Sequence, residues 1–183
     1  MATEFSIRFS GAGGQGLIQA ARILAEAAAI YDNKNAAESC SYGPEARGNA
    51  SRADIIISEE AIDYPKADAV DLLMVLTQEA YDRSIKDLSP EGVVVTDSRI
   101  RTGEELSGRK LYQAAFTEIA EKQCGRPGVV NIVALGFFAA VNKIIDVKSI
   151  RQAMLARVPK MSEEIYIGAY EAGLKAAREL GIK

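Results

Sequence analysis

The chain has 183 residues, 48% of them hydrophobic and 26% charged, which is the balance of an ordinary soluble domain large enough to bury a core. Its formal net charge of −3 argues against a nucleic-acid-binding protein, because such proteins usually carry a basic face. The sequence has no histidine and only two cysteines, Cys40 and Cys124. These counts exclude Ser-His and Cys-His nucleophile pairs, histidine-ligated zinc or haem, and a four-cysteine iron–sulfur cluster held by this chain alone.

The hydropathy pattern offers no membrane anchor. The longest apolar run, residues 133–141, is far shorter than the roughly 20 residues that span a bilayer. The N-terminal apolar run is interrupted by Arg8, so it does not resemble a signal peptide. We therefore expect a cytoplasmic protein without nucleic-acid or membrane partners.

The first half of the chain predicts strands separated by helices. Phe5, Ile7 and Phe9 alternate with polar residues, which is typical of a strand. A glycine-rich turn at residues 11–16 leads into a helix predicted over about residues 15–31. Further strands are predicted at residues 36–42, at the β-branched run of residues 53–58, and at residues 72–76.

The second half becomes increasingly helical. A helix is predicted at residues 78–88, ended by residues 89–92, and Val93–Val95 predicts another buried strand. A strand at residues 110–116 and a short helix at residues 118–123 follow. The last third predicts helices over residues 130–143, 147–157 and 162–180. Ser162 and the two glutamates after it favour a helix start, through side-chain capping and the helix dipole.

Strands that alternate with helices indicate one α/β domain over residues 1–183. We expect a three-layer α/β/α arrangement with a mostly parallel or mixed sheet. Its start is Rossmann-like, and its C-terminal third is helical.

The glycine-rich turn is the first candidate binding site. Gly11, Gly13 and Gly16 match the pattern G-x-G-x-x-G between a predicted strand and a predicted helix. Glycine allows positive φ angles and a close approach of the backbone to a ligand. The helix N-terminus offers free N–H groups and a positive dipole end, which suit a phosphate. The candidate cofactor-binding residues are Gly11, Gly13, Gly14, Gln15 and Gly16.

A dinucleotide-binding fold also needs an acidic residue about 20 positions further on, at the end of the second strand, to hold a ribose. Asp32 lies near the predicted helix end and Glu38 lies inside the next strand, so neither is well placed. Three interpretations of the glycine turn stay open: a dinucleotide site, a structural tight turn, and a contact with an anion or a partner.

A second constellation occupies residues 41–49, Ser-Tyr-Gly-Pro-Glu-Ala-Arg-Gly-Asn. One interpretation is a solvated turn, with an ion pair between Glu45 and Arg47 that contributes little. The other is a shaped loop that presents Tyr42 and Arg47 to a partner, because tyrosine and arginine are enriched at interface hot spots. The candidate interface residues are Tyr42, Gly43, Pro44, Glu45, Arg47 and Gly48.

Together, the segments Gly-Ala-Gly-Gly-Gln-Gly at 11–16 and Ser-Tyr-Gly-Pro-Glu-Ala-Arg-Gly at 41–48 resemble the gamma subunit of 2-oxoacid:ferredoxin oxidoreductases. The likeness continues in order and covers nearly the whole chain, through residues 58–65, 69–81, 92–98, 131–136 and 169–173. Asn131, which opens one of these segments, is assigned to the partner interface on the same basis.

The resemblance implies a complex that oxidatively decarboxylates a 2-oxoacid with coenzyme A and passes two electrons to ferredoxin, as in anaerobic metabolism. It implies partner alpha, beta and delta subunits, which carry the thiamine diphosphate, the magnesium and the iron–sulfur clusters. This chain then needs no cofactor, catalytic residue or metal site of its own, and we expect it to be inactive in isolation. The glycine turn and Arg47 are expected to meet a phosphate of coenzyme A.

The substrate and two other functions stay open. We expect 2-oxoglutarate first, with pyruvate, branched-chain 2-oxoacids and indolepyruvate as alternatives. A free-standing nucleotide-binding Rossmann-like oxidoreductase would bind a nicotinamide or flavin by itself. A purely structural scaffold subunit would show no kinetic effect when its loops are altered.

Overall fold

A computed structural model describes residues 4–42, 50–64 and 66–182. The strands are β1 (Phe5–Ala12), β2 (Asn35–Tyr42), β3 (Ala50–Ser58), β4 (Val70–Val75), β5 (Leu88–Asp97) and β6 (Lys110–Ala114). The α-helices are α1 (Leu17–Glu26), α2 (Gln78–Ser84), α3 (Phe116–Glu118), α4 (Val130–Val141), α5 (Val147–Arg157) and α6 (Glu163–Glu179). Short helical turns are η1 (Ala27–Tyr31), η2 (Ile85–Asp87), η3 (Glu104–Leu106), η4 (Ile119–Gln123), η5 (Pro127–Val129) and η6 (Lys160–Ser162).

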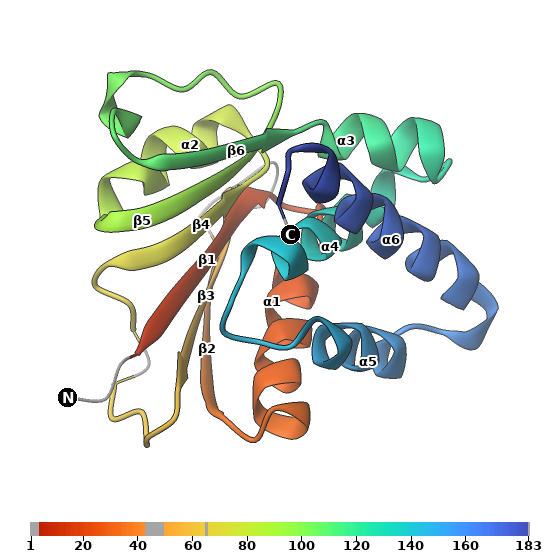
Figure 1. Ribbon diagram of the computed structural model, residues 1–183, viewed down its shortest axis with the longest axis horizontal. Helices are drawn as coiled ribbons and strands as arrows, with labels where there is room; N and C mark the ends of the chain where they lie inside the picture. Colours follow the sequence, from red (N-terminus) through yellow and green to blue (C-terminus); the bar gives the residue numbers. More distant parts are fainter. Residues whose placement is uncertain (1–3, 43–49, 65, 183) are drawn as a thin grey trace.

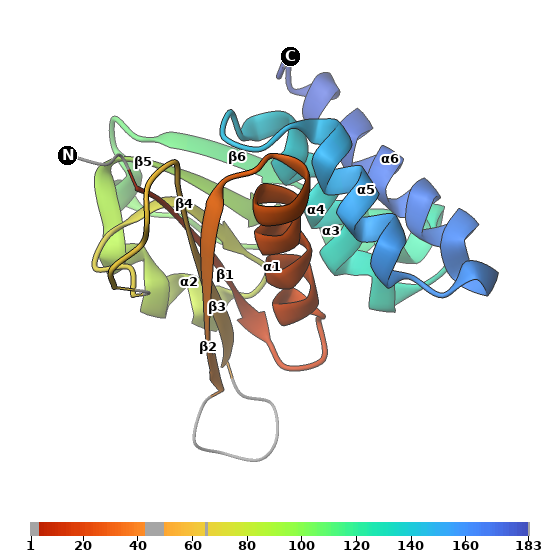
Figure 2. The same ribbon diagram turned by 90° about the horizontal axis from the view of Figure 1, so that it is seen from below.

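One six-stranded sheet, in the order β2-β3-β1-β4-β5-β6, organises the molecule (Figure 1). Strands β1, β4, β5 and β6 are parallel, whereas β3 runs antiparallel to both of its neighbours. Helices α1, α4, α5 and α6 cover one face, and α2 lies on the other (Figure 2). The mixed sheet, the three layers and the helical C-terminal third are confirmed.

Several predicted boundaries shift. The helix predicted to reach residue 88 ends as an α-helix at Ser84, and the four residues after Leu88 belong to β5. They form an irregularity there, since Val70 pairs with Leu88 but Leu72 already pairs with Val93. Pro90, which has no N–H to donate, is tolerated at such a bulge. The predicted capping by Ser162 is wrong, because its side chain makes no capping hydrogen bond to α6.

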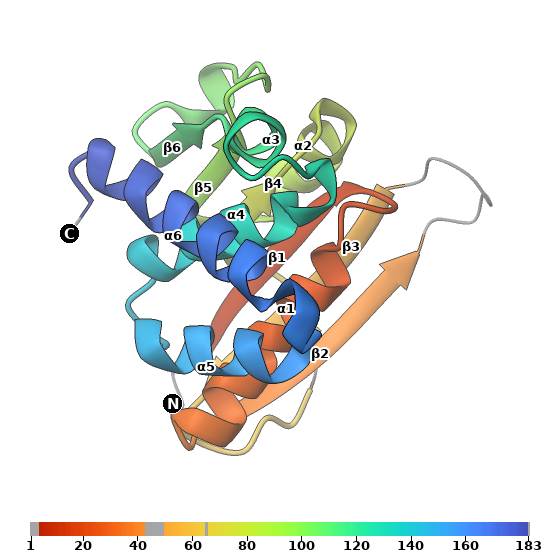
Figure 3. The ribbon, with the colours of Figure 1, turned by 90° about the vertical axis from the view of Figure 1, so that its right-hand side faces the viewer.

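The main core lies between the sheet and the helical layer, where Figure 3 shows α4 between the sheet and α6. Residues 130–139 of α4 are all buried. An added Cβ on Gly136 would lie 2.0 Å from the carbonyl oxygen of Tyr170, and one on Gly173 would lie 2.0 Å from that of Val133. The two glycines therefore let α4 and α6 cross with their backbones in contact. Two of the segments that carry the family resemblance meet at this crossing.

The helices of the described residues include none long and apolar enough to cross a membrane. The cytoplasmic location stays a prediction from the sequence.

Candidate functional site

The topology places a switch point at the carboxyl edge of the sheet, between the connections that follow β1 and β4. The parallel strands β1 and β4 are neighbours. After β1 the chain turns into α1 on the main helical face, and after β4 it turns into α2 on the opposite face (Figure 2). In open α/β sheets, ligands bind outside the carboxyl ends of the strands where successive connections diverge in this way. The glycine turn lies at this point, because it directly follows β1.

The turn is held by its own residues. Gly14 and Gly16 have φ angles of +86° and +72°, a region that side chains other than glycine rarely adopt. The Oε1 atom of Gln15 folds back and accepts a hydrogen bond from the backbone N–H of Ala12 at 2.7 Å. Gly13 and Gly14 are exposed at the tip. The predicted strand–turn–helix start is therefore confirmed, with an accessible backbone.

Among the described residues, no side chain caps the first N–H groups of α1. The N-cap residue is Gly16, which has no side chain that could accept a hydrogen bond from these N–H groups. The first turn also contains no acidic residue. The first N–H groups of a helix have no intrahelical acceptor and carry the positive end of the dipole. This end of α1 can therefore accept an anionic group.

Asn131, at the start of α4, supports the glycine turn through hydrogen bonds. Its Nδ2 atom donates to the carbonyl oxygen of Gly16 at 3.0 Å and to Oε1 of Gln19 at 3.3 Å. A Cβ on Gly16 would lie 2.5 Å from that nitrogen. The side chain is 2% exposed, and its Oδ1 accepts no hydrogen bond from the described residues. Asn131 thus contacts the glycine turn inside this chain, and its assignment to a partner interface stays a prediction.

The second motif begins and ends at the same edge. Tyr42, the last residue of β2, pairs with Ser51, and Ala50, the first residue of β3, pairs with Ala12 just before the glycine turn. The segment therefore begins on β2, one strand away from β1, and ends on β3, the strand next to β1. Only the backbone of Tyr42 is described, and Gly43, Pro44, Glu45, Arg47 and Gly48 lie outside the described residues, so their interface role stays a prediction.

The acidic residues considered for ribose binding are engaged elsewhere. Asp32 accepts a hydrogen bond from the backbone N–H of Asp146 at 2.8 Å and another from the hydroxyl of Ser149, so it holds the start of α5. Glu38 pairs with Arg22 at 3.4 Å. In addition, β3 lies between β1 and β2, whereas a dinucleotide fingerprint places the acid on the strand beside β1. The geometry disfavours the dinucleotide interpretation.

Residues at and after the ends of β4 and β5 complete the edge, and no site role was predicted for them from the sequence. Asp97, 1% exposed, accepts hydrogen bonds from the N–H and hydroxyl of Thr117, both at 2.9 Å, and from the N–H and Nε of Arg99. Burial alone would raise the pKa of Asp97, but the hydrogen bonds from Thr117 and Arg99 lower it. The carboxylate therefore stays ionised and holds the two loops together. The sequence signal that could have identified Asp97 is its position at the end of a predicted strand.

Two arginines stand at this edge. The side chain of Arg99 is largely exposed, and its charge is paired with Asp97, Nε to Oδ1 at 3.0 Å, whereas Arg101 is exposed and forms no ion pair with the described residues. The backbone N–H of Arg101 donates to Oε1 of Gln78 at 2.8 Å, and its carbonyl oxygen accepts from Nε2 of the same side chain. Gln78 begins α2, so the loops after β4 and β5 are fixed to each other. The edge therefore combines a glycine turn, a helix N-terminus and positive charge.

The described part of the chain brings together no group of three or more histidine, cysteine, aspartate or glutamate residues that could hold a metal ion. Cys40 is exposed on β2, and Cys124 follows η4. Partial desolvation of the sulfur atom, together with the hydrogen bond to Glu38 and the charge of that carboxylate, raises the pKa of the Cys40 thiol to about 11. Burial also raises the pKa of Cys124. Both cysteines are therefore neutral thiols at physiological pH, as expected for unreactive residues.

Comparisons with known proteins agree with the motifs. The family model described as "Pyruvate ferredoxin/flavodoxin oxidoreductase" matches residues 6–179. The chain is 43% identical over 176 residues to "2-oxoglutarate synthase subunit KorC" of Methanocaldococcus jannaschii, covering 95% of this chain and 94% of that protein. A keto/oxoacid ferredoxin oxidoreductase gamma subunit from Geobacter sulfurreducens superposes with a TM-score of 0.86 and 40% identity, covering 100% of this chain and 99% of that one.

A 2-oxoglutarate:ferredoxin oxidoreductase from Magnetococcus marinus, solved with 2-oxoglutarate, coenzyme A and succinyl-CoA bound, shares the fold. Its TM-score is 0.88 at 20% identity, with 98% of this chain and 32% of that chain covered. The family match and the near-complete coverage of two relatives at 40% identity or more leave one conclusion. This chain belongs to the pyruvate ferredoxin/flavodoxin oxidoreductase family and is homologous to the gamma subunits of 2-oxoacid:ferredoxin oxidoreductases.

Proposed function

We propose that the chain is the gamma subunit of a complex that oxidises 2-oxoglutarate with coenzyme A and ferredoxin. The observation that supports 2-oxoglutarate as the substrate is the 43% sequence identity to KorC of Methanocaldococcus jannaschii, over nearly the whole length of both proteins. The "Pyruvate synthase subunit PorC" of the same organism matches less well, at 33% identity over 81% of this chain. In this proposal residues 1–183 form one gamma-type domain of a cytoplasmic enzyme that assembles with alpha, beta and delta subunits.

The proposed division of labour follows from the residues of this chain. It has no histidine, and both of its thiols have raised pKa values. Its most deeply engaged carboxylate at the candidate site, Asp97, is ionised and fully hydrogen-bonded, so it is not a poised general acid. The chain would therefore supply binding surface, while thiamine diphosphate and iron–sulfur chemistry belong to the partner subunits. We expect no turnover by the isolated chain.

The substrate can be tested on the complex purified through a tag on this chain. Ferredoxin reduction would be measured with 2-oxoglutarate, pyruvate and 2-oxoisovalerate at saturating coenzyme A. We expect kcat/KM for 2-oxoglutarate to exceed the other two at least tenfold. Equal or better use of pyruvate contradicts the substrate, but not the role as a gamma subunit.

We further propose that the carboxyl edge contacts a phosphate of coenzyme A. The support is the N-terminus of α1, whose first N–H groups have no acceptor shown among the described residues, the exposed tip at Gly13 and Gly14, and the exposed Arg101 at the same edge. Phosphate groups are well matched to backbone N–H groups at a helix start and to guanidinium groups. Arg47, from the second motif, is the expected additional cation.

A matched pair of glycine variants tests this contact. Gly14 and Gly108 both have positive φ, +86° and +79°, and among the described residues no atom lies within 4 Å of an added Cβ on either. Gly14→Ala and Gly108→Ala should therefore cost a similar strain of about 1–2 kcal/mol. Only Gly14→Ala should raise KM for coenzyme A, by at least about threefold, in the assembled complex. Equal KM values for the two variants would remove the glycine turn from the site.

Arg47→Ala in the same complex tests the second motif. We expect a weaker coenzyme A affinity, measured by titration of the intact complex. Unchanged affinity would remove Arg47 from this role. If neither loop affects coenzyme A or the rate, the scaffold function replaces the proposed one.

A further inference from the structure

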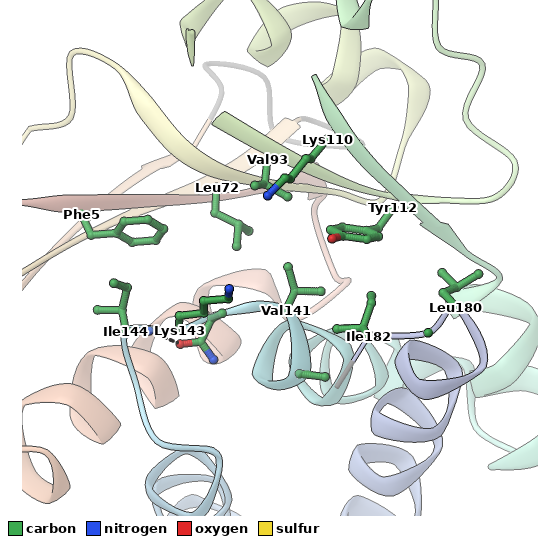
Figure 4. A pocket seen from close by; sticks show the side chains of 13 residues that line it. Phe5, Leu72, Val93, Lys110, Tyr112, Val141, Lys143, Ile144, Leu180 and Ile182 are labelled. Atoms are coloured by element: carbon green, nitrogen blue, oxygen red, sulfur yellow. Dashed lines mark hydrogen bonds between the residues drawn. The ribbon is translucent and has the colours of Figure 1, made fainter. Parts of the chain in front are cut away.

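A cavity lies at the amino edge of the sheet, opposite the glycine turn, where Phe5 begins β1 and Lys110 begins β6. Its volume is about 550 Å³, within the range of roughly 300–1,000 Å³ typical of small-molecule sites. The sheet forms one wall, and the end of α4 and the C-terminal segment form the other (Figure 4). The lining residues are Phe5, Leu72, Val93, Lys110, Tyr112, Ala140, Val141, Asn142, Lys143, Ile144, Leu180, Gly181 and Ile182.

Most of the cavity wall is apolar, and the charged side chains that line it are two lysines. Lys110 from the sheet and Lys143 from the helical layer direct their side-chain nitrogens into the cavity, and Tyr112 turns its hydroxyl into the same space (Figure 4). The lining residues of the described chain include no aspartate or glutamate to neutralise the two lysines. Neither lysine forms an ion pair with a carboxylate among the described residues.

The backbone on either side of Lys143 is held by its neighbour Asn142. Asn142 donates to the carbonyl oxygens of Phe138 and Ala139 and accepts the N–H groups of Ile144 and Ile145, at 3.0 and 2.7 Å. Its amide is thus fully used in ending α4 and in shaping the next turn. The negative end of the α4 dipole, about half a charge, favours one cation here. Among the described residues, two lysines exceed that requirement and leave an excess of positive charge beside an apolar wall.

We propose that this cavity binds a small organic carboxylate with an aliphatic or aromatic body. The carboxylate lies between Lys110 and Lys143 and accepts a hydrogen bond from Tyr112, and the body packs against Leu72, Val93 and Val141. The apolar wall alone would suit any hydrophobic group. The two lysines, which form no ion pair with a carboxylate of the described residues, select an anion. The proposal does not rest on the function proposed above, because the cavity and the glycine turn lie at opposite edges of the sheet.

Calorimetric titration of the full chain with alkyl probes tests the site. Octanoate should bind at least tenfold more tightly than octanol, which lacks the charge, and than acetate, which lacks the body. Shortening octanoate to hexanoate should weaken binding about tenfold, since each buried methylene contributes roughly a factor of three to four. The absence of saturable octanoate binding, or equal binding of octanol, overturns the proposal.

Charge variants locate the site. Lys110→Gln and Lys143→Gln should each weaken octanoate binding about threefold, and the double variant about tenfold, as expected for solvent-accessible ion pairs. Lys86→Gln is the matched control, since Lys86 is an exposed lysine in η2, away from the cavity lining. An effect of Lys86→Gln equal to that of Lys143→Gln overturns the proposal. So does loss of octanoate binding when the chain is assembled in its complex, because that result makes this face a subunit interface.

Discussion

The two faces of strand β1 are stabilised by different interactions. Ile7 and Phe9 point to the helical layer, and the ring of Phe9 lies 5.9 Å from that of Phe138. On the other face of the same strand, Arg8 is 1% exposed and pairs with Asp54 of β3, with Nε to Oδ1 at 2.7 Å. Residues one position apart thus belong to an apolar core and to a buried ionic cluster.

The ionic cluster is shared among four side chains. Asp54 accepts from Arg8 and also from Nε of Arg52 at 3.0 Å, and Arg8 also reaches Asp87 beside the end of α2. Taking charges out of water is costly, so such a cluster persists only when its hydrogen bonds are complete. The stability of the apolar face depends on how well its side chains fill the available volume. The stability of the ionic face depends on each buried charge keeping a partner of opposite charge. The two faces should therefore respond to different substitutions.

Removing one carboxylate should have the largest effect. Asp54→Asn leaves the buried guanidinium of Arg8 with Asp87 as its remaining carboxylate, and we expect a loss of about 3–5 kcal/mol in the free energy of unfolding. Arg52→Gln, at a half-exposed partner of the same carboxylate, should cost about 1 kcal/mol or less. Urea denaturation of both variants measures the difference. Equal losses would mean that burial does not govern the cluster.

The same carboxylate should produce part of the acid sensitivity of the fold. Burial by itself raises the pKa of Asp54, but the hydrogen bonds from Arg52 and Arg8 lower it below its ordinary value. A carboxyl with a lowered folded-state pKa stabilises the fold above its unfolded pKa of about 3.9, and this contribution is lost as the pH falls through the folded-state pKa. The stability difference between the wild type and Asp54→Asn should be constant near pH 7 and shrink below about pH 4. A difference that is independent of pH from 7 to 3 would contradict this assignment.

On the apolar face, the test is an added methyl group. Gly136→Ala and Gly173→Ala would each place a Cβ 2.0 Å from a backbone oxygen of the partner helix, so α4 and α6 must move apart. We expect each to cost about 1–3 kcal/mol or more. Gly168→Ala, also in α6 but with nothing within 4 Å of its Cβ, should instead stabilise by up to about 1 kcal/mol. Thermal unfolding of the three variants gives the comparison, and destabilisation by Gly168→Ala would attribute the effect to the helix rather than to the crossing.

Local patterns predicted the elements of β1 but not the environment of its polar side chains. The alternation of Phe5, Ile7 and Phe9 indicated a strand correctly, because the period of two is a local property. That Arg8 is buried depends on Asp54, which is 46 positions away and is brought opposite by the β1–β3 register. Such a pairing has no local signature.

The candidate site shows the same division. The glycine pattern predicted a turn between a strand and a helix, and that is what residues 11–16 form. It did not predict that β3 inserts beside β1, since strand order is set by pairing between distant segments. Nor did it predict Asn131, which supports Gly16 from 115 positions away. The resemblance to the family, which covers the chain in order, carried the function further than any single motif.

The smallest expected effect separates two helix starts, one on each side of the sheet. Thr77 is the N-cap of α2, and its side-chain oxygen accepts from the N–H of Ala80 at 3.4 Å, whereas Ser162 makes no such bond at α6. Thr77→Ala should therefore cost about 1 kcal/mol, and Ser162→Ala about 0.5 kcal/mol or less, in the same denaturation assay. The long α6 is anchored by its crossing with α4, so it does not depend on a cap. The seven residues of α2 have little else to define where the helix begins. Equal losses for the two variants would show that hydroxyl groups at helix starts contribute here through solvent rather than through the N–H of the first turn.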